Sequence, residues 1–158
     1  DVYKRQTALG GGRRILEVRI MLSYTMIGSN DLSASGRFYN AILLPLGYEV
    51  ERWEKQLCYS MPGIEDQENG PGAFHVTTPY DGKPATVGNG TMVAFRAPTH
   101  EKVRSLHTEG LRCGGVDEGA PGFREAYSPK FFVGYLRDPD GNKVALFCTS
   151  DSEPIRPK

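Results

Sequence analysis

The chain has 158 residues, of which 39% are hydrophobic, and its 19 lysines and arginines balance 19 aspartates and glutamates. This size and composition are typical of one globular domain with a buried core. The balanced charge, without a basic stripe, argues against nucleic acid or an anionic membrane surface as a partner. No apolar stretch approaches the roughly 20 residues of a membrane span. We therefore expect a small-molecule ligand, with no nucleic-acid partner and no membrane partner.

The first twenty residues differ in composition from the rest of the chain. They contain a run of three glycines followed by two arginines, and they lack the ordered basic and apolar regions of a signal peptide. We interpret residues 1–20 as an N-terminal extension that is either disordered or a non-native read-through sequence, with the domain beginning at Met21.

Two similar patterns occupy residues 21–80 and 90–150. In each, a β-prone run is followed by a helix cap, an amphipathic helix and further short strands. The sequence predicts strands at 22–28, 48–54, 57–61 and 73–78 in the first pattern and at 91–97, 131–137 and 144–148 in the second. Residues 80–90, rich in glycine, read as a connector, and residues 151–158 as a disordered tail.

The expected fold class is α+β. Two β-α-β-β-β modules would form a curled mixed sheet around a shared cavity, with the helices on the outer face. The turn at Asp138-Pro-Asp-Gly-Asn142 joins two strands of the second module as a hairpin. It lacks the spaced carboxylates and closing glutamate of a calcium loop.

Three segments resemble the vicinal oxygen chelate (VOC) superfamily of glyoxalases, bleomycin resistance proteins and dioxygenases. Tyr135-Leu-Arg-Asp-Pro-Asp-Gly-Asn-Lys-Val144 is similar to the C-terminal signature of that superfamily, and Asn30-Asp-Leu with Phe38-Tyr39 to its first strand-helix junction. The tract 80–92 resembles a bacterial glyoxalase-like subgroup. The resemblance covers about residues 21–150 and implies paired β-α-β-β-β modules, a homodimer and, in the enzymes, one divalent metal.

The metal ligands that this resemblance implies are missing. The superfamily places a His or Gln on the first strand of each module and a Glu on the last strand, and the matching residues here are Tyr24, Met92, His75 and Ala145. An alanine methyl donates nothing, a thioether is a soft ligand, and a phenol must lose a proton to bind well. We expect no metal and no other cofactor, with a divalent metal as the alternative.

Strand alternation predicts which side chains line the cavity. One face carries the predicted ligand-binding residues, which are Tyr24, His75, Thr77, Met92, Arg96, Ala145 and Phe147. The intervening positions are more uniformly apolar and suit packing beneath the helices; they are Thr25, Ile27, Phe74, Val76, Val93, Phe95, Val144 and Leu146. The cavity would be largely apolar with a few polar groups.

Several polar residues have both a functional and a structural interpretation. His75 and Tyr24 are the candidate catalytic residues, as proton carriers; the alternatives are a hydrogen-bonded histidine without chemistry and, favoured for Tyr24, an aromatic ring that fills space. Arg96 suits a ligand carboxylate, or is a solvated surface charge. We expect His100 and His107 to face solvent.

The cysteines bear on compartment and chemistry. Cys58, Cys113 and Cys148 are odd in number and far apart, which argues against a disulfide framework and favours the reducing cytoplasm. Cys58 and Cys148 lie in strand-like contexts with no neighbouring base, so we interpret them as inert thiols.

Two classes of function remain open. The first is a VOC-type binding protein that holds a small organic molecule in its cavity without the metal. The alternative is a glyoxalase-type lyase or isomerase, similar to lactoylglutathione lyase, or a dioxygenase. Such an enzyme would depend on a metal or use His75 and Tyr24 without one.

Overall fold

The computed structural model describes residues 22–64 and 66–157 of the chain. The first module contains β1 (Tyr24–Gly28), α1 (Leu32–Leu43), a short 3-10 helix (Leu44–Leu46), β2 (Glu49–Trp53), β3 (Gln56–Ser60) and β4 (Ala73–Thr77). The second contains β5 (Met92–Arg96), α2 (His100–Arg112), β6 (Val116–Phe123), β7 (Phe132–Arg137) and β8 (Lys143–Cys148). The predicted α+β fold with two β-α-β-β-β modules is confirmed, and β6, where no strand was predicted, completes the second module. The N-terminal extension predicted at 1–20 lies outside the described residues.

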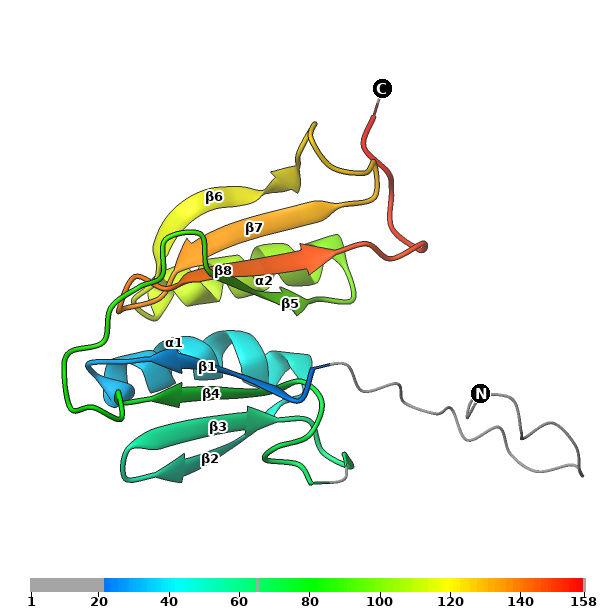
Figure 1. Ribbon diagram of the computed structural model, residues 1–158. Coiled ribbons are helices and arrows are strands. Elements are labelled where there is room, and N and C mark those ends of the chain that lie inside the picture. Colours follow the sequence, from blue (N-terminus) through cyan, green and yellow to red (C-terminus); the bar gives the residue numbers. More distant parts are fainter. Residues whose placement is uncertain (1–21, 65, 158) are drawn as a thin grey trace, which may run out of the picture.

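Each module builds its own four-stranded mixed sheet. The strand orders are β1-β4-β3-β2 and β5-β8-β7-β6, so the same topology occurs twice. In both sheets the first strand pairs parallel with the last, and the remaining pairs are antiparallel. Figure 1 shows the sheets one above the other, with β1 and β5 at their facing edges. The two sheets are separate hydrogen-bonded units and do not close into a barrel.

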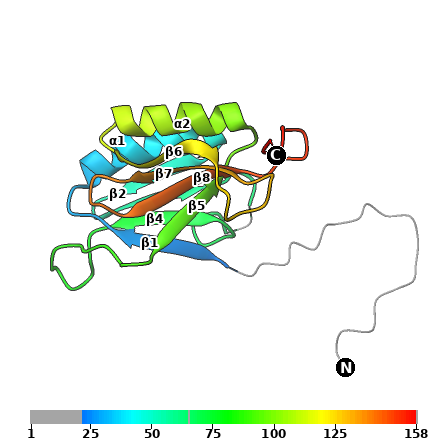
Figure 2. The ribbon, with the colours of Figure 1, turned by 90° about the horizontal axis from the view of Figure 1, so that it is seen from above.

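Both helices cover the same side of the sheets, as Figure 2 shows. The Asp31 carboxylate caps α1 by accepting hydrogen bonds from the Ser33 and Ala34 amides at 2.9 and 3.0 Å. Gly110 lies where α2 meets α1 and β7, and a Cβ there would approach Leu136 Cδ1 to 2.6 Å. The missing side chain therefore permits the close approach of the helices. Neither α1 nor α2, the two α-helices of the described residues, has the length and hydropathy of a membrane span.

One hydrophobic core lies between the helices and the sheets and extends through both modules. The ring centroids of Phe74 on β4 and Phe95 on β5 are 5.2 Å apart in an edge-to-face contact. The predicted helix-facing residues Ile27, Phe74, Val76, Phe95, Val144 and Leu146 all belong to this core. Val93 packs against it from a partly buried position. The predicted alternation of the strands is confirmed, because the core occupies the faces that the helices cover.

Two histidines of α2 depart from the prediction. His100 and His107 were expected to face solvent, yet they are 5% and 4% exposed. Their spacing of seven residues does place them on one helix face, but that face packs on the sheet. His107 Nε2 donates to the Tyr135 carbonyl at 3.1 Å, and the His100 ring stacks on Phe132 at 4.2 Å. The Tyr135 carbonyl thus satisfies His107. The Glu153 carboxylate lies 3.3 Å from His100 Nδ1, whereas His100 Nε2 is buried with no hydrogen-bond partner among the described residues.

The segment predicted to be a disordered tail has defined contacts in its described part, residues 151–157. The Arg156 amide donates to the Pro129 carbonyl at 2.8 Å, and its guanidinium donates to the Arg124 carbonyl at 2.7 Å. The Glu153 carboxylate accepts the His100 amide at 3.0 Å, at the start of α2. The tail is therefore packed against the second module by contacts with residues distant in the sequence.

The predicted hairpin turn at 138–142 also joins the two modules. The buried Asp138 carboxylate accepts the Tyr39 hydroxyl of α1 at 2.8 Å, as well as the amide of Asn142 at 2.8 Å and that of Asp140 at 3.0 Å. Burial and the neighbouring carboxylate raise the pKa of Tyr39 well above its usual value, so the phenol remains the donor. Asp140 in turn accepts the Asn30 amide at 2.9 Å. The segments on which the resemblance rests thus contact each other.

We predict that Asp138→Ala lowers the free energy of unfolding by about 3 kcal/mol, because several buried donors lose their acceptor. Chemical denaturation of the purified variant measures this. Asp81→Ala, which removes an exposed connector carboxylate, should leave the unfolding free energy within about 0.5 kcal/mol of the parent. Equal stability of the two variants would show that the Asp138 network does not hold the modules together.

Candidate functional site

The sheet face that the helices leave uncovered is the candidate site. The strand register aligns Glu51, Cys58, His75 and Met26 in one row across the first sheet. Since the alternate positions are in the core, all seven residues predicted to line the cavity lie on this open face: Tyr24, His75, Thr77, Met92, Arg96, Ala145 and Phe147.

His75 is the most enclosed polar residue of the predicted set, with 5% of its surface exposed. Its Nε2 lies 2.9 Å from the Glu68 carbonyl, which can only accept, so Nε2 carries the proton. Its Nδ1 then accepts a hydrogen bond from the Gln56 side-chain amide. The Tyr24 ring meets the imidazole edge to face, with centroids 5.2 Å apart. The structure therefore brings the two catalytic candidates together, but engages both nitrogens of His75 with other groups.

Cys58 lies beside this histidine and is itself buried. Its Sγ is 3.9 Å from His75 Nε2. Burial raises the pKa of the Cys58 thiol, and the carboxylates of Glu68 and Glu51 raise it further. A raised pKa keeps the sulfur protonated, and the nearby imidazole nitrogen is a donor rather than a base. The pair does not have the arrangement of an activated nucleophile.

Two hollows indent the molecule on either side of the connector. The first has a volume of about 770 Å³ and is lined by Met26, Ser29, Asn30, Lys55, Gln56, Thr77, Thr78, Pro79, Tyr80, Gly82, Lys83 and Pro84. The second has a volume of about 820 Å³ and is lined by Val87, Gly88, Asn89, Gly90, Thr91, Met92, Tyr127, Tyr135, Arg137, Gly141 and Lys143. Of the predicted cavity residues, Thr77 lines the first hollow and Met92 the second.

Asn30 fixes the connector between the two hollows. Its side-chain oxygen accepts the Ala85 amide at 2.7 Å, and its side-chain nitrogen donates to the Ala85 carbonyl at 3.1 Å and to Asp140 at 3.0 Å. Gly28 supports the same contact, because a Cβ there would lie 2.9 Å from the Ala85 Cβ. A residue predicted only as part of the first strand-helix junction thus positions the wall that separates the hollows.

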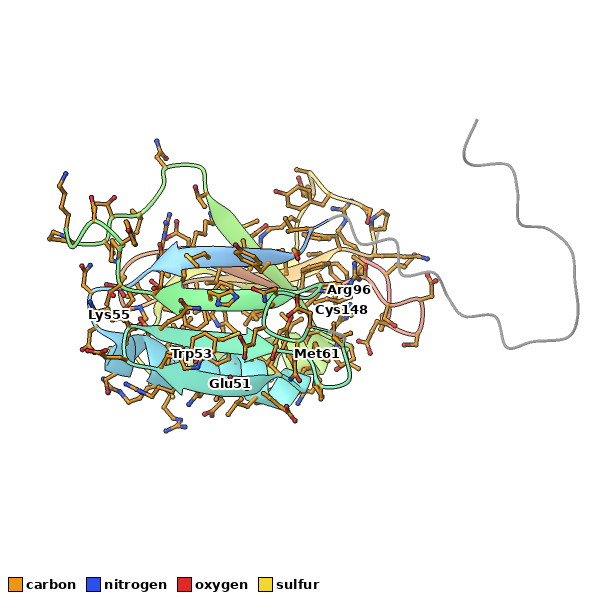
Figure 3. All side chains as sticks on the ribbon, turned by 60° about the horizontal axis from the view of Figure 1, so that its bottom comes forward. Glu51, Trp53, Lys55, Met61, Arg96 and Cys148 are labelled. Atoms are coloured by element: carbon orange, nitrogen blue, oxygen red, sulfur yellow. The ribbon has the colours of Figure 1, made fainter. Side chains whose placement is uncertain are left out.

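Arg96 and Phe147 form a contact of their own on the open face. The guanidinium of Arg96 lies 4.6 Å from the centre of the Phe147 ring and donates to the Thr149 hydroxyl. Figure 3 shows Arg96 and Lys55 at opposite ends of the sheets, with Glu51 on the outer strand β2. Arg96 is therefore exposed, as a surface charge would be. Its guanidinium also has defined partners on the open face, as a ligand-binding residue would.

Solved structures share this fold. A glyoxalase/bleomycin resistance protein from Albidiferax ferrireducens T118 is 38% identical, with a TM-score of 0.69, over 81% of this chain and 98% of that one. The chain belongs to the glyoxalase/bleomycin resistance protein family. The resemblance to the VOC superfamily, of which this family is part, is thereby confirmed.

More distant structures show the same fold alone. A glyoxalase-related enzyme from Fulvimarina pelagi is 21% identical, with a TM-score of 0.61, over 80% of this chain and 86% of that one. A glyoxalase/bleomycin resistance protein/dioxygenase family enzyme from Burkholderia phytofirmans PsJN is 16% identical, with a TM-score of 0.61, over 81% and 98%. No family model matches the chain, and no curated protein matches it either.

The residues of this glyoxalase/bleomycin resistance family member do not fit the superfamily metal. Tyr24 and Met92 take equivalent places on β1 and β5, and His75 and Ala145 on β4 and β8. Ala145 has no donor atom, Met92 offers only a thioether, and both nitrogens of His75 are engaged. Across residues 22–64 and 66–157, no three His, Cys, Asp or Glu side chains are grouped so as to hold a metal.

Several residues that line the two hollows were not among the predicted cavity residues. Lys55 lies in the turn between β2 and β3, and Tyr127 lies in the loop between β6 and β7, where strand alternation gives no guidance. Tyr135, Arg137 and Lys143 are strand residues on the open face, and their alternation with buried neighbours was an available signal.

We expect His75 to act as a structural residue. His75→Ala should lower the free energy of unfolding by about 2 kcal/mol, because it leaves the Gln56 amide and the Glu68 carbonyl without their partner. Urea titration followed by circular dichroism measures the change, and Tyr24→Phe, which removes only the hydroxyl of a half-exposed side chain, is the matched control. A His75→Ala protein as stable as the control would contradict the structural role.

Proposed function

We propose that this protein binds a small organic molecule on its open sheet face without the metal of its superfamily. The observation that carries the proposal is the identity of the residues at the four positions that match the superfamily's metal ligands. These residues are Tyr24, His75, Met92 and Ala145. An apolar group at two of these positions removes the donors that a divalent ion needs in fixed geometry.

The two hollows support a binding function. Their volumes of about 770 and 820 Å³ lie within the roughly 300–1,000 Å³ typical of small-molecule sites. Both are lined by polar and apolar residues together, and both border the connector that Asn30 fixes to Ala85. A fixed wall keeps a site formed before the ligand arrives, which reduces the entropy cost of binding.

The alternative function is a glyoxalase-like lyase or isomerase, or a dioxygenase. It is favoured by the names of the solved relatives, which include a glyoxalase-related enzyme. A metal-free enzyme would need His75 or Tyr24 as a proton carrier, and the partners of the His75 nitrogens argue against that role. Fold likeness alone does not establish chemistry.

The cysteines agree with the predicted reducing cytoplasm. Cys58, Cys113 and Cys148 are all free thiols, and two of them are buried. Protein disulfides are rare where glutathione and thioredoxin keep thiols reduced. Cytoplasmic localisation and a homodimer remain predictions of this proposal.

The proposal predicts that Met92→Trp weakens the binding of small organic fragments, because the larger ring fills the mouth of the second hollow. A fragment library screened by ligand-observed NMR identifies binders of the parent chain, and amide shift changes locate them. The matched control is Leu111→Trp on α2, since Leu111 is 39% exposed and Met92 is 45% exposed. If fragments shift only amides of the helices, or none bind, the open face is not a small-molecule site.

A further inference from the structure

Aromatic side chains gather on the second module, whose sheet is the upper one in Figure 1, from β7, β8 and the loop before β7. Phe147 and Phe131 are stacked with centroids 5.4 Å apart and an interplanar angle of 26°. Phe131 meets Tyr127 edge to face at 4.9 Å. Tyr127 and Tyr135 then both line the second hollow. A planar ligand ring entering this hollow would find aromatic surface on its walls.

Cations accompany these rings. Lys143 Nζ lies 4.9 Å from the centre of the Tyr135 ring, and the Arg124 guanidinium lies 5.5 Å from it. Arg96 is placed in the same way over Phe147, at 4.6 Å. Cation–π contacts hold these charged groups over the rings without neutralising them.

The charge at the second hollow is positive. Its described lining residues include Arg137 and Lys143 and no carboxylate. The carboxylate that contacts both cations is Glu118, whose Oε1 accepts Arg137 Nη2 at 2.7 Å. Lys143 Nζ is 3.9 Å from the same oxygen, which makes an ion pair without a hydrogen bond. Glu118 is therefore hydrogen-bonded to Arg137, and the N–H groups of Lys143 are not taken up by this carboxylate.

The guanidinium of Arg137 is held by its own partners and is not free to bind a ligand. Besides Glu118 it donates to the Gly141 carbonyl at 3.1 Å, which holds the guanidinium against the hairpin turn. The first hollow also contains cations, because Lys55 and Lys83 line it, and Lys83 is 81% exposed and lies 3.8 Å from the Asp81 carboxylate. Its walls differ, since Tyr80 is the one aromatic ring among its described lining residues. The second hollow combines two tyrosine rings with a lysine that lies over one of them.

We propose that the second hollow binds a planar aromatic molecule that carries an anionic group such as a carboxylate. Lys143 holds the anion, and the rings of Tyr127 and Tyr135 contact the aromatic part. This inference rests on the proposed small-molecule function of the open face and names the chemical class of its ligand.

Two matched probes test the charge requirement. 2-Naphthoate is an anion at neutral pH, and 2-naphthalenemethanol has the same ring system without the charge. Each is titrated into the full chain while amide shifts are followed by NMR. We expect 2-naphthoate to bind about tenfold more tightly than the alcohol, with shift changes at residues 127–137 and 141–144.

Variants of Lys143 test the residue. Lys143→Gln should weaken 2-naphthoate binding about tenfold, and Lys143→Arg should restore most of the affinity, because it keeps the charge. The matched control is Lys83→Gln in the first hollow, which should leave the affinity unchanged. Tyr127→Ala gives a second variant at a half-exposed position, and it should weaken both probes equally through loss of ring contact.

The outcomes separate the two proposals. Equal affinity for the two probes at the second hollow, or no effect of Lys143→Gln, overturns the anionic ligand class and leaves the small-molecule site intact. Binding of neither probe to the open face overturns this inference, and the fragment screen then decides the proposed function independently.

Discussion

The buried carboxylate of Asp138 is the constraint on which the rest of the structure depends. It accepts the Tyr39 hydroxyl from α1 and the Asn142 amide from its own turn, and so joins the modules through a group that water does not reach. Next to it, Asp140 holds Asn30, and Asn30 holds the connector at Ala85. The same series of hydrogen bonds therefore sets the packing of the modules and the wall between the hollows.

Much of the fold could be predicted because its signals are local. The alternation in Phe74-His75-Val76 shows which side chains enter the core, since successive strand residues point to opposite faces. Asp31 marks the start of α1 because its side chain satisfies the amides of residues two and three positions later. These interactions span a few residues, so a single sequence contains them.

The remaining features depend on residues distant in the sequence. His107 is buried because Tyr135 offers a carbonyl 28 positions later, and no local pattern indicates that partner. The described tail packs through Arg156 on the Pro129 carbonyl in the same way. The lining of the second hollow combines the connector with the loop at Tyr127 and with Lys143. Tertiary placement, rather than residue type, turns these positions into a site.

The proposed function links the missing superfamily donors with the positive, aromatic second hollow. In that proposal, side chains of the open face take over the recognition that a metal held by β1, β4, β5 and β8 would otherwise provide. Ala145 is the plainest sign of this change, because a buried methyl group offers neither a donor nor a charge.

The metal content of the protein tests the central claim most directly. The chain, expressed in medium supplemented with nickel, zinc, iron and manganese and then desalted, is subjected to elemental analysis, and its melting temperature is recorded before and after EDTA. The account predicts a substoichiometric trace of each metal and an unchanged melting temperature. One divalent metal per chain, with a melting temperature that falls on chelation, would contradict it.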